Sequence, residues 1–397
     1  MKNGWETYTL GQMCQLISGR HIDAKNYNTD LRGVGYLTGP SDFGKVNPIV
    51  SKWTEHPIVK ANSGDILITV KGSGVGKINL LDIDQIAISR QLMAVRVTGA
   101  DPRYVYLFLN SAFDHFQAAS SGAAIPGISR EQILRLTIPC PSLPEQRRIV
   151  GILDEAFAGI AIAKANAEKN LQNARALFES HLNDVLGSKS WEWKKLGDLC
   201  NGVEYGSASK SKKQGKVPVL RMGNIQGGRL DWGNLVYTDD KEEIKKYLLK
   251  HNDVLFNRTN SPELVGKTAI YKSERPSIFA GYLIRIHRNE ELLDADFLNY
   301  FLNSEIASEY GKTVVISSVN QANINGTKLM GYPIPVPALS EQRAVVENLD
   351  ELSQETQRLE TIYQRKLAAF DELKKSLLHQ AFSGQLTGDA VCIEASG

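Results

Sequence analysis

A glycine-rich run, Lys71-Gly-Ser-Gly-Val-Gly-Lys77, comes nearer than other segments to a nucleotide-binding motif. A phosphate loop has the pattern Gly-x4-Gly-Lys-Ser/Thr, in which backbone amides hold phosphate oxygens and the hydroxyl binds Mg²⁺. Here Lys71 replaces the first glycine and Ile78 replaces the hydroxyl residue. The similar run from Ser261 to Thr268 has the threonine but lacks the first glycine. We therefore predict no nucleotide site, and instead a turn whose backbone N–H groups approach a nucleic-acid phosphate.

Motifs for other kinds of chemistry are missing as well. An adenine methyltransferase needs an Asn/Asp-Pro-Pro-Tyr/Phe segment, and the nearest match, Asp101-Pro-Arg-Tyr104, has the pattern of a helix start. The four cysteines form no Cys-x-x-Cys pair and the seven histidines are dispersed, which excludes the common zinc spacings and a disulfide framework. We expect no catalytic residue, metal or cofactor here, although a triad assembled from distant residues would leave no such signature.

Polar side chains suited to nucleic acid gather in the second half of the chain. Arg, Asn and Gln contact base edges, whereas Lys, Ser and backbone N–H groups contact phosphates. The segment 207–216 holds four lysines and no acid, which is typical of a phosphate-contacting loop or, alternatively, of a solvated loop. Asn257-Arg-Thr-Asn-Ser261 follows an apolar run and groups several base-contacting residue types. Asn320 and Gln321 form a weaker candidate pair.

Composition limits these interpretations. The 397 residues include 46 Lys and Arg against 44 Asp and Glu, so any basic surface must be local. No apolar run approaches the roughly 18 residues of a membrane span, and no apolar stretch follows the first residues as a secretory signal would. We therefore expect a soluble, cytoplasmic protein of two or three domains with no membrane partner.

The sequence is internally duplicated. Residues 138–155, IPCPSLPEQRRIVGILDE, return as residues 334–351, IPVPALSEQRAVVENLDE, with eleven of eighteen positions identical at an offset of 196. Further matches occur in the same order at offsets from 186 upward: Trp5 with Trp191, Asp65 with Asp253, Gly76-Lys77 with Gly266-Lys267, and Phe108–Ser111 with Phe301–Ser304. Each copy begins with a mixed region of short β-rich runs, such as 66–70 and 282–286, separated by turn residues. A short helix, near 104–110 or 297–303, and a proline-rich stretch close each region.

A long helix is predicted after each proline-rich stretch, from 145 to 186 and from 341 to about 382. Apolar residues recur there every three or four positions, as in a coiled coil. The first series is rich in alanine and the second contains bulky residues such as Tyr363 and Phe370, which favours one intramolecular antiparallel pair. The alternative is that each helix packs on its own module or on a partner. Gly187 and Gly384 are expected to cap the helices.

These repeated segments resemble the specificity subunit of type I restriction–modification systems over nearly the whole chain. The resemblance is most specific at Leu143-Pro-Glu-Gln-Arg147 and Leu339-Ser-Glu-Gln-Arg343, where Ser340 replaces the family's usual proline. Gly64-Asp-Ile-Leu67 is also family-like, and its counterpart Asn252-Asp-Val-Leu255 lacks the glycine. Arg221-Met-Gly-Asn-Ile225 matches the family's Arg-x-x-Asn-Ile strand, whereas the first copy has Leu37-Thr-Gly-Pro-Ser41 there.

The resemblance implies an α+β fold with two pseudo-repeated target recognition domains, 1–144 and 188–340, each built on small twisted β-sheets. Two long helices, 145–187 and 341–386, would separate them as an antiparallel coiled coil, followed by a tail at 387–397. Each domain would recognise one half of a bipartite double-stranded DNA site. The helices would set the spacing and dock two methyltransferase subunits, which restriction/translocase subunits join. S-adenosylmethionine, ATP and Mg²⁺ would serve those partners, and this chain would be non-catalytic.

Two other classes of function stay open. A stand-alone DNA-binding regulator would bind its sequence without partners, and a coiled-coil scaffold would not bind DNA at all. The residues predicted to contact DNA are Lys71, Ser73, Lys77, Arg90, Gln91, Lys210, Lys212, Lys213, Arg221, Asn224, Asn257, Arg258, Thr259, Asn260, Lys267, Asn320 and Gln321.

Overall fold

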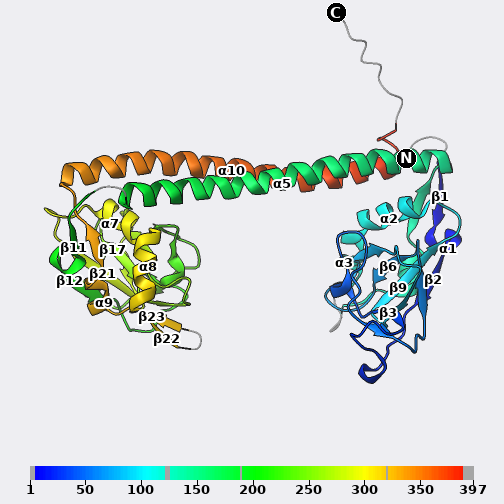
Figure 1. Cartoon of the computed structure of the whole chain (residues 1–397), viewed down its shortest axis with the longest axis horizontal. Coiled ribbons are helices and arrows are strands. Elements are labelled where there is room, and N and C mark those ends of the chain that lie inside the picture. The colour runs from blue at the N-terminus through cyan, green and yellow to red at the C-terminus, as the bar shows by residue number, and fades with distance from the viewer. Residues whose placement is uncertain (1–4, 121–125, 188–189, 319–320, 388–397) are drawn as a thin grey trace, which may run out of the picture. The chain divides into compact units, whose positions relative to one another are not determined.

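The computed structural model describes residues 5–120, 126–187, 190–318 and 321–387 (Figure 1). The chain divides into two compact units, one formed by residues 1–167 with 365–397 and the other by residues 168–364. Each unit contains a mixed module, followed in sequence by one of the long helices. We call residues 5–142 module one and residues 190–338 module two.

Module one is built on two four-stranded sheets. The first is antiparallel, in the order β2 (Cys14–Ser18), β9 (Leu92–Val97), β6 (Ile66–Thr69) and β7 (Ile78–Leu80). The second has the order β4 (Trp53–Thr54), β3 (Val34–Leu37), β8 (Gln85–Ile88) and β5 (Lys60–Asn62), with β3 and β8 parallel. Strand β6 is buried on both faces, because Ile66 and Ile68 pack toward the helices and Leu67 packs toward the second sheet. This two-sided burial accounts for its uninterrupted apolar sequence.

Short elements close module one against the long helices. They are β1 (Glu6–Thr9), α1 (Leu10–Met13), α2 (Pro102–Ser111), α3 (Phe113–Ser120), α4 (Arg130–Leu134) and β10 (Thr137–Cys140), which pairs with β1. Helix α2 lies between the first sheet and the helix pair (Figure 1), and six of its residues are buried. The ring of Phe382, near the end of the second long helix, meets Tyr104 and Phe108 at centroid distances of 5.2 and 5.3 Å.

Module two repeats this plan. Its first sheet has the order β12 (Cys200–Tyr205), β21 (Leu283–Arg288), β17 (Val254–Asn257) and β19 (Thr268–Ile270), all antiparallel as in module one. Its second sheet contains β16 (Val236–Thr238), β13 (Val217–Leu220) and β20 (Ile278–Phe279), with β13 and β20 parallel. The equivalent helices are α7 (Ala295–Leu302), α8 (Glu305–Val314) and α9 (Gly326–Met330), and β11 (Trp193–Lys195) pairs with β24 (Pro333–Pro335). The predicted duplication is thus confirmed at the level of strand order.

Among the described residues, several helices and strands of module two have no helix or strand as counterpart in module one. They are the hairpin β14 (Ile225–Gln226) and β15 (Arg229–Leu230), helix α6 (Lys241–Tyr247), and a small sheet of β18 (Thr259–Asn260), β23 (Gln321–Asn323) and β22 (Ile316–Ser318). In module one, the counterpart of the β18–β23 pairing is an isolated bridge between Lys71 and Gly127. The offset between the copies grows by only two residues, from 186 to 188, across the segment that holds the hairpin and α6, so module one has a similar number of residues there.

The long helices are α5 (Leu143–Gly187) and α10 (Leu339–Ser383), each 45 residues long. Within the first unit, Lys374 lies over the Phe157 ring and Lys164 pairs with Asp371 at 2.7 Å, so the two segments run in opposite directions. Within the second unit, Arg175 pairs with Glu360 at 3.0 Å. The predicted antiparallel pairing is confirmed, and both helices also pack on the modules, which the alternative had proposed. Gly384 ends α10 with a left-handed φ of 81°.

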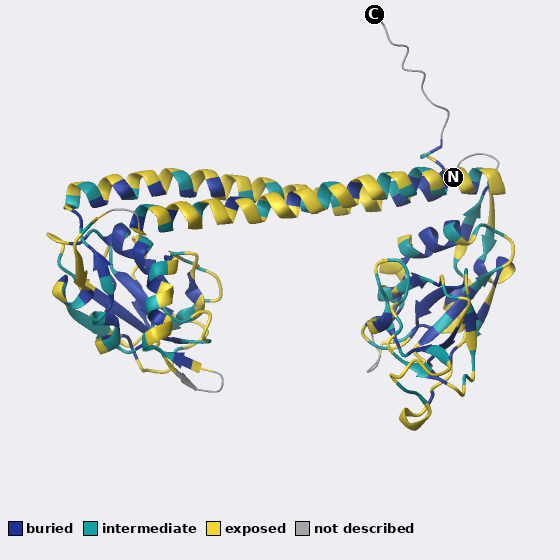
Figure 2. Ribbon diagram, viewed as in Figure 1, coloured by how far each residue is buried: buried dark blue, intermediate teal, exposed yellow. Residues whose placement is uncertain are grey.

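A buried glutamine joins each long helix to its module, which explains the repeated Glu-Gln-Arg segment. Gln146 Oε1 accepts from Asp101 N at 2.9 Å, and its Nε2 donates to Pro141 O at 2.8 Å. Gln342 does the same with Asp294 N at 2.8 Å and Pro337 O at 2.9 Å. Both aspartates in turn cap α2 and α7 by accepting backbone N–H groups, as predicted for Asp101. Figure 2 shows the buried faces along these junctions.

Candidate nucleic-acid interface

The predicted contact residues gather mainly at one end of the first sheet in each module. In module one this strand-end surface comprises Ser18, residues 69–77 and residues 90–91; in module two it comprises Tyr205, residues 257–267 and residues 281–282. In module one, Val70 N donates to Gln91 O at 2.8 Å, and Gly76 N donates to Thr69 O at 2.9 Å. Strand β7 follows this turn, so the turn lacks the helix N-terminus on which a phosphate loop depends.

Five predicted residues of module one are exposed on the strand-end surface: Lys71, Ser73, Lys77, Arg90 and Gln91. The 71–77 turn, which carries the first three of them, contains two left-handed glycines, Gly72 and Gly76, at φ of 89° and 82°. Among the residues that the structure describes, no ion pair involves Lys71, Lys77 or Arg90. These cations are therefore available to an anionic ligand without first losing an acidic partner.

The polar segment of module two is less open than its sequence indicated. Asn257 is 1% exposed, and its Nδ2 donates to Leu264 O at 3.3 Å. Thr259 is also buried, and its hydroxyl accepts from Asn323 Nδ2 at 2.7 Å. Asn260 Oδ1 accepts from Ser261 N at 2.9 Å. Asn257 and Thr259 thus support the fold, and their contact with DNA stays a prediction that would require these buried groups to become accessible.

Arg258 is the residue of this segment that is best placed to meet a ligand. Its guanidinium lies 4.8 Å from the centroid of the Tyr205 ring, and its Nη1 donates to Gly281 O at 3.3 Å. Its Nε is buried without a hydrogen-bond partner in the described part of the chain. Stacking on an aromatic ring orients the guanidinium and leaves its remaining N–H groups for an acceptor.

The lysine-rich loop meets an acid that lies far away in the sequence. Lys212 Nζ pairs with Asp239 at 3.2 Å, and Asp239 also accepts from Lys216 N at 2.9 Å. Both contacts lower the pKa of Asp239, and the backbone hydrogen bond from Lys216 has the larger effect. The carboxylate of Asp239 is therefore ionised at neutral pH. Lys210 and Lys213 are exposed and have no ion pair among the described residues. Lys212 is therefore a weaker candidate phosphate contact than these two.

The Arg-x-x-Asn-Ile segment is a structural turn. Asn224 is 3% exposed; it accepts from Arg221 N at 2.9 Å and donates to Asp231 O at 3.0 Å. Asn224 is therefore buried and hydrogen-bonded within the fold, and its contact with DNA stays a prediction, whereas Arg221 is exposed and donates to Asn234 O. Module one has the same turn with Asp42 in the asparagine's place, accepting from Thr38 N at 2.6 Å.

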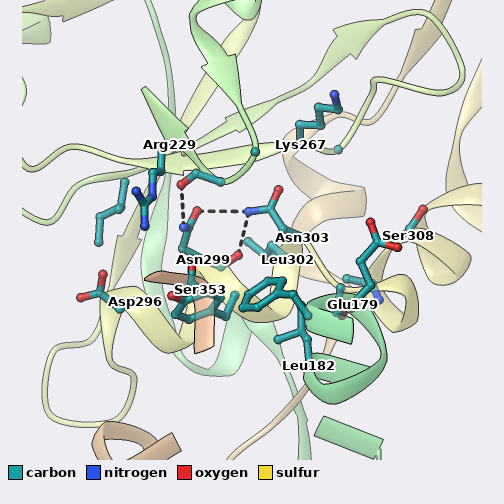
Figure 3. Close-up of a pocket in the computed structure, with 18 of the residues that line it drawn as sticks. Glu179, Leu182, Arg229, Lys267, Asp296, Asn299, Leu302, Asn303, Ser308 and Ser353 are labelled. Atoms are coloured by element: carbon teal, nitrogen blue, oxygen red, sulfur yellow. Dashed lines mark hydrogen bonds between the residues drawn. The ribbon is translucent and has the colours of Figure 1, made fainter. Parts of the chain in front are cut away.

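The remaining candidates are Lys267, Gln321 and Asn320. Lys267 is half-buried and lines a cavity of about 1210 Å³ within the second unit, between module two and the long-helix segments (Figure 3). Asn299 and Asn303 also line this cavity; Thr268 Oγ1 donates to Asn299 Oδ1 at 2.9 Å and accepts from Asn303 Nδ2 at 2.6 Å. Gln321 is exposed on β23. Asn320 lies outside the described residues, as does most of the predicted tail at 387–397.

Two exposed tyrosines were missed by sequence reasoning. Tyr205 supports Arg258, and Tyr282 follows Gly281, which accepts from Arg258. Tyr205 ends β12 and Tyr282 lies in the turn just before β21, where a partly exposed aromatic ring is a common ligand contact. Aligning the two copies would have marked Tyr205, because the same strand of module one ends in the small residue Ser18.

The described residues offer little that could bind a metal ion or act as a nucleophile. Within the described ranges, no three His, Cys, Asp or Glu side chains are arranged to hold a metal ion. Burial raises the pKa of the Cys14 and Cys200 thiols to about 12, which keeps them protonated and unreactive. None of the described helices is long and apolar enough to cross a membrane.

Comparison with known proteins agrees with the duplicated architecture. A family model described as the type I restriction modification DNA specificity domain matches residues 2–173 and, a second time, residues 188–366. The specificity subunit of the StySPI type I restriction enzyme from Salmonella potsdam is 28% identical over 312 residues, which cover 72% of this chain and 66% of that subunit. The chain thus spans slightly less than two thirds of this relative.

Solved structures show the same fold. A chain from a study of complex assembly and conformational transition of the type I R-M system superimposes with a TM-score of 0.79 at 20% identity, covering 97% of this chain and 99% of that one. The HsdS subunit from Thermoanaerobacter tengcongensis superimposes with a TM-score of 0.59 at 21% identity, covering 97% of this chain and 98% of that one.

Proposed function

Since the chain belongs to the family of type I restriction–modification DNA specificity proteins, we propose that it is the non-catalytic subunit through which such a complex recognises a bipartite double-stranded DNA target. Each module contacts one half-site. The observation that carries the proposal is the repetition of one strand-end surface in both modules, with exposed, unpaired cations in module one and a ring-supported arginine in module two. A target with two separate halves is the simplest ligand for two such surfaces on one chain.

The long helices supply the partner surface in this proposal. Apolar side chains remain in water on α5 and α10, with Ile162 at 65% exposed and Leu177 at 53%. Such residues favour a protein partner, since surface helices usually keep their apolar residues on the packed face. We propose that two methyltransferase subunits dock there and that restriction/translocase subunits join them. S-adenosylmethionine, ATP and Mg²⁺ serve those subunits.

A binding experiment with the partner tests this function. The chain is co-expressed with the methyltransferase subunit of its own system, the complex is purified, and adenine methylation is mapped on genomic DNA with and without this chain. We expect co-purification, methylation at one bipartite motif only when the chain is present, and a footprint with two protected half-sites. Tight sequence-specific binding by the chain alone, without co-purification, would identify a stand-alone regulator. No shift of any duplex would identify a scaffold.

Helix length provides a second test, because the helices separate the two half-sites in this proposal. Inserting four residues after Leu171 lengthens α5 by about 6 Å. Since DNA rises ~3.4 Å per base pair, the preferred spacer should grow by about one to two base pairs with unchanged half-sites. The same insertion beside Gly215, in the lysine-rich loop, should leave the spacer unchanged. A spacer that ignores helix length would contradict the role of the helices.

A further inference from the structure

The two modules differ at three neighbouring positions, two on the strand-end surface and one at the start of the helix beside it. Module two has Tyr205 at the end of β12, Arg258 after β17 and Gly326 at the start of α9. The equivalent positions of module one are Ser18 at the end of β2, Val70 after β6, and Arg130 at the start of α4. An arginine is present in both sets, but on different elements.

Backbone hydrogen bonds establish this equivalence independently of the side chains. Arg258 N donates to Tyr282 O at 3.1 Å and its carbonyl accepts from Ile324 N at 2.9 Å. Val70 makes the same two bonds, to Gln91 O at 2.8 Å and from Ile128 N at 3.0 Å. Val70 therefore occupies the position of Arg258.

The helix starts match as well. Ser129 caps α4 by accepting from Gln132 N, and Asn325 caps α9 by accepting from Lys328 N. The next residue is Arg130 in module one and Gly326 in module two. Arg130 thus stands where module two has a residue without a side chain.

The space around the helix start explains why the two modules carry the arginine at different positions. The Tyr205 hydroxyl accepts from Gly326 N at 2.7 Å, and a Cβ on Gly326 would lie 3.1 Å from that hydroxyl and 2.9 Å from Val203. Module two therefore has room for the ring only if residue 326 is glycine. In module one the small Ser18 leaves the place open, and Arg130 Nη1 reaches the Ser18 hydroxyl at 3.5 Å.

We propose that Arg130 is the base-contacting arginine of module one, the counterpart of Arg258 delivered from α4. This inference rests on the proposed function. Arg130 is exposed and has no ion pair among the described residues, because its neighbour Glu131 pairs with Arg135 instead. The turn beside it carries Lys71, which is also exposed. A guanidinium bordered by phosphate-contacting lysines is suited to the acceptor edge of a guanine in the major groove.

The test compares arginine variants in the complex with the methyltransferase. Arg130→Ala should weaken binding to the cognate DNA by about 10- to 100-fold and relax one position of one half-site. Arg258→Ala should relax one position of the opposite half-site. Arg130→Lys, which keeps the charge but not the planar fork, should also relax that position. Arg135→Lys changes the exposed cation that follows α4 but keeps a positive charge beside Glu131, and it should change binding less than twofold.

The outcomes separate the inference from the proposed function. If the wild-type complex shows no bipartite preference, the proposed function fails and the inference fails with it. If the wild type is bipartite but Arg130→Ala binds and methylates like the wild type, the inference alone is overturned. A uniform loss across all sequences, restored by Arg130→Lys, would make Arg130 a phosphate contact and would also overturn it. Unchanged thermal unfolding of the variants shows that these effects are local.

Discussion

Module one and module two hold the same aspartate with arginines from different strand positions. In module one, Arg96 binds Asp65 at 2.8 Å. In module two, Arg285 binds the equivalent Asp253 at 3.0 Å. Arg285 is paired with Leu255 on β17, whereas the residue paired with the equivalent Leu67 is Ala94. The duplicated backbone has thus been kept while the positions that supply charged side chains have changed, at this buried site and on the strand-end surface.

Replacing these two arginines is the strongest test of this comparison. Arg285 is 7% exposed and also binds Glu204. Arg285→Ala therefore leaves two carboxylates without their arginine and should lower the free energy of unfolding by about 3–5 kcal/mol. Arg96 is one-third exposed and binds one carboxylate rather than two, so Arg96→Ala should cost about 1–3 kcal/mol. Denaturant unfolding followed by tryptophan fluorescence measures both. Equal costs would show that the second acid and the deeper burial do not matter.

The buried glutamines test a feature that the two modules share, so equivalent substitutions should have similar effects on stability in both. Gln146→Met and Gln342→Met each leave a part-buried backbone N–H and at least one carbonyl without the glutamine as partner, and each should cost about 2–3 kcal/mol. Arg147→Met is the matched control, because its side chain is exposed and lies 3.8 Å from Asp101, and it should cost about 0–1 kcal/mol. A cost confined to one module would contradict the equivalence of the junctions.

The smallest effect concerns the lysine-rich loop, which module one lacks. Lys210→Ala should reduce the slope of log K against log salt by about one unit, whereas Lys212→Ala should reduce it less because Asp239 already neutralises Lys212. Asp239→Asn frees Lys212 and should steepen the slope in magnitude by up to about one unit. Affinity for nonspecific duplex DNA, measured across salt concentrations, tests this. Identical slopes for both lysine variants would show that the ion pair opens on DNA.

Much of the architecture was predictable because its signals are local or periodic. The predicted helices at 145–186 and 341–382 agree with α5 and α10 to within two residues at each end. The β-rich run at 66–70 corresponds to β6. Turns that recur in both copies could also be predicted from the sequence. Such a turn does not require glycine where another residue, such as asparagine, tolerates a left-handed backbone. Asn252, at φ of 69°, replaces Gly64, at φ of 86°.

Residue type and order were therefore sufficient for the duplication, the two helices and the junctions that tie them to the modules. They were insufficient for the contact surface, because a sequence shows which groups a side chain carries and not which of them already have partners. Asn224 and Thr259 have base-contacting groups, yet the fold uses them internally. Lys212 meets Asp239 only through the pairing of distant segments. Arg130 emerges beside Ser18, 112 residues away, because tertiary packing brings the start of α4 to the end of β2.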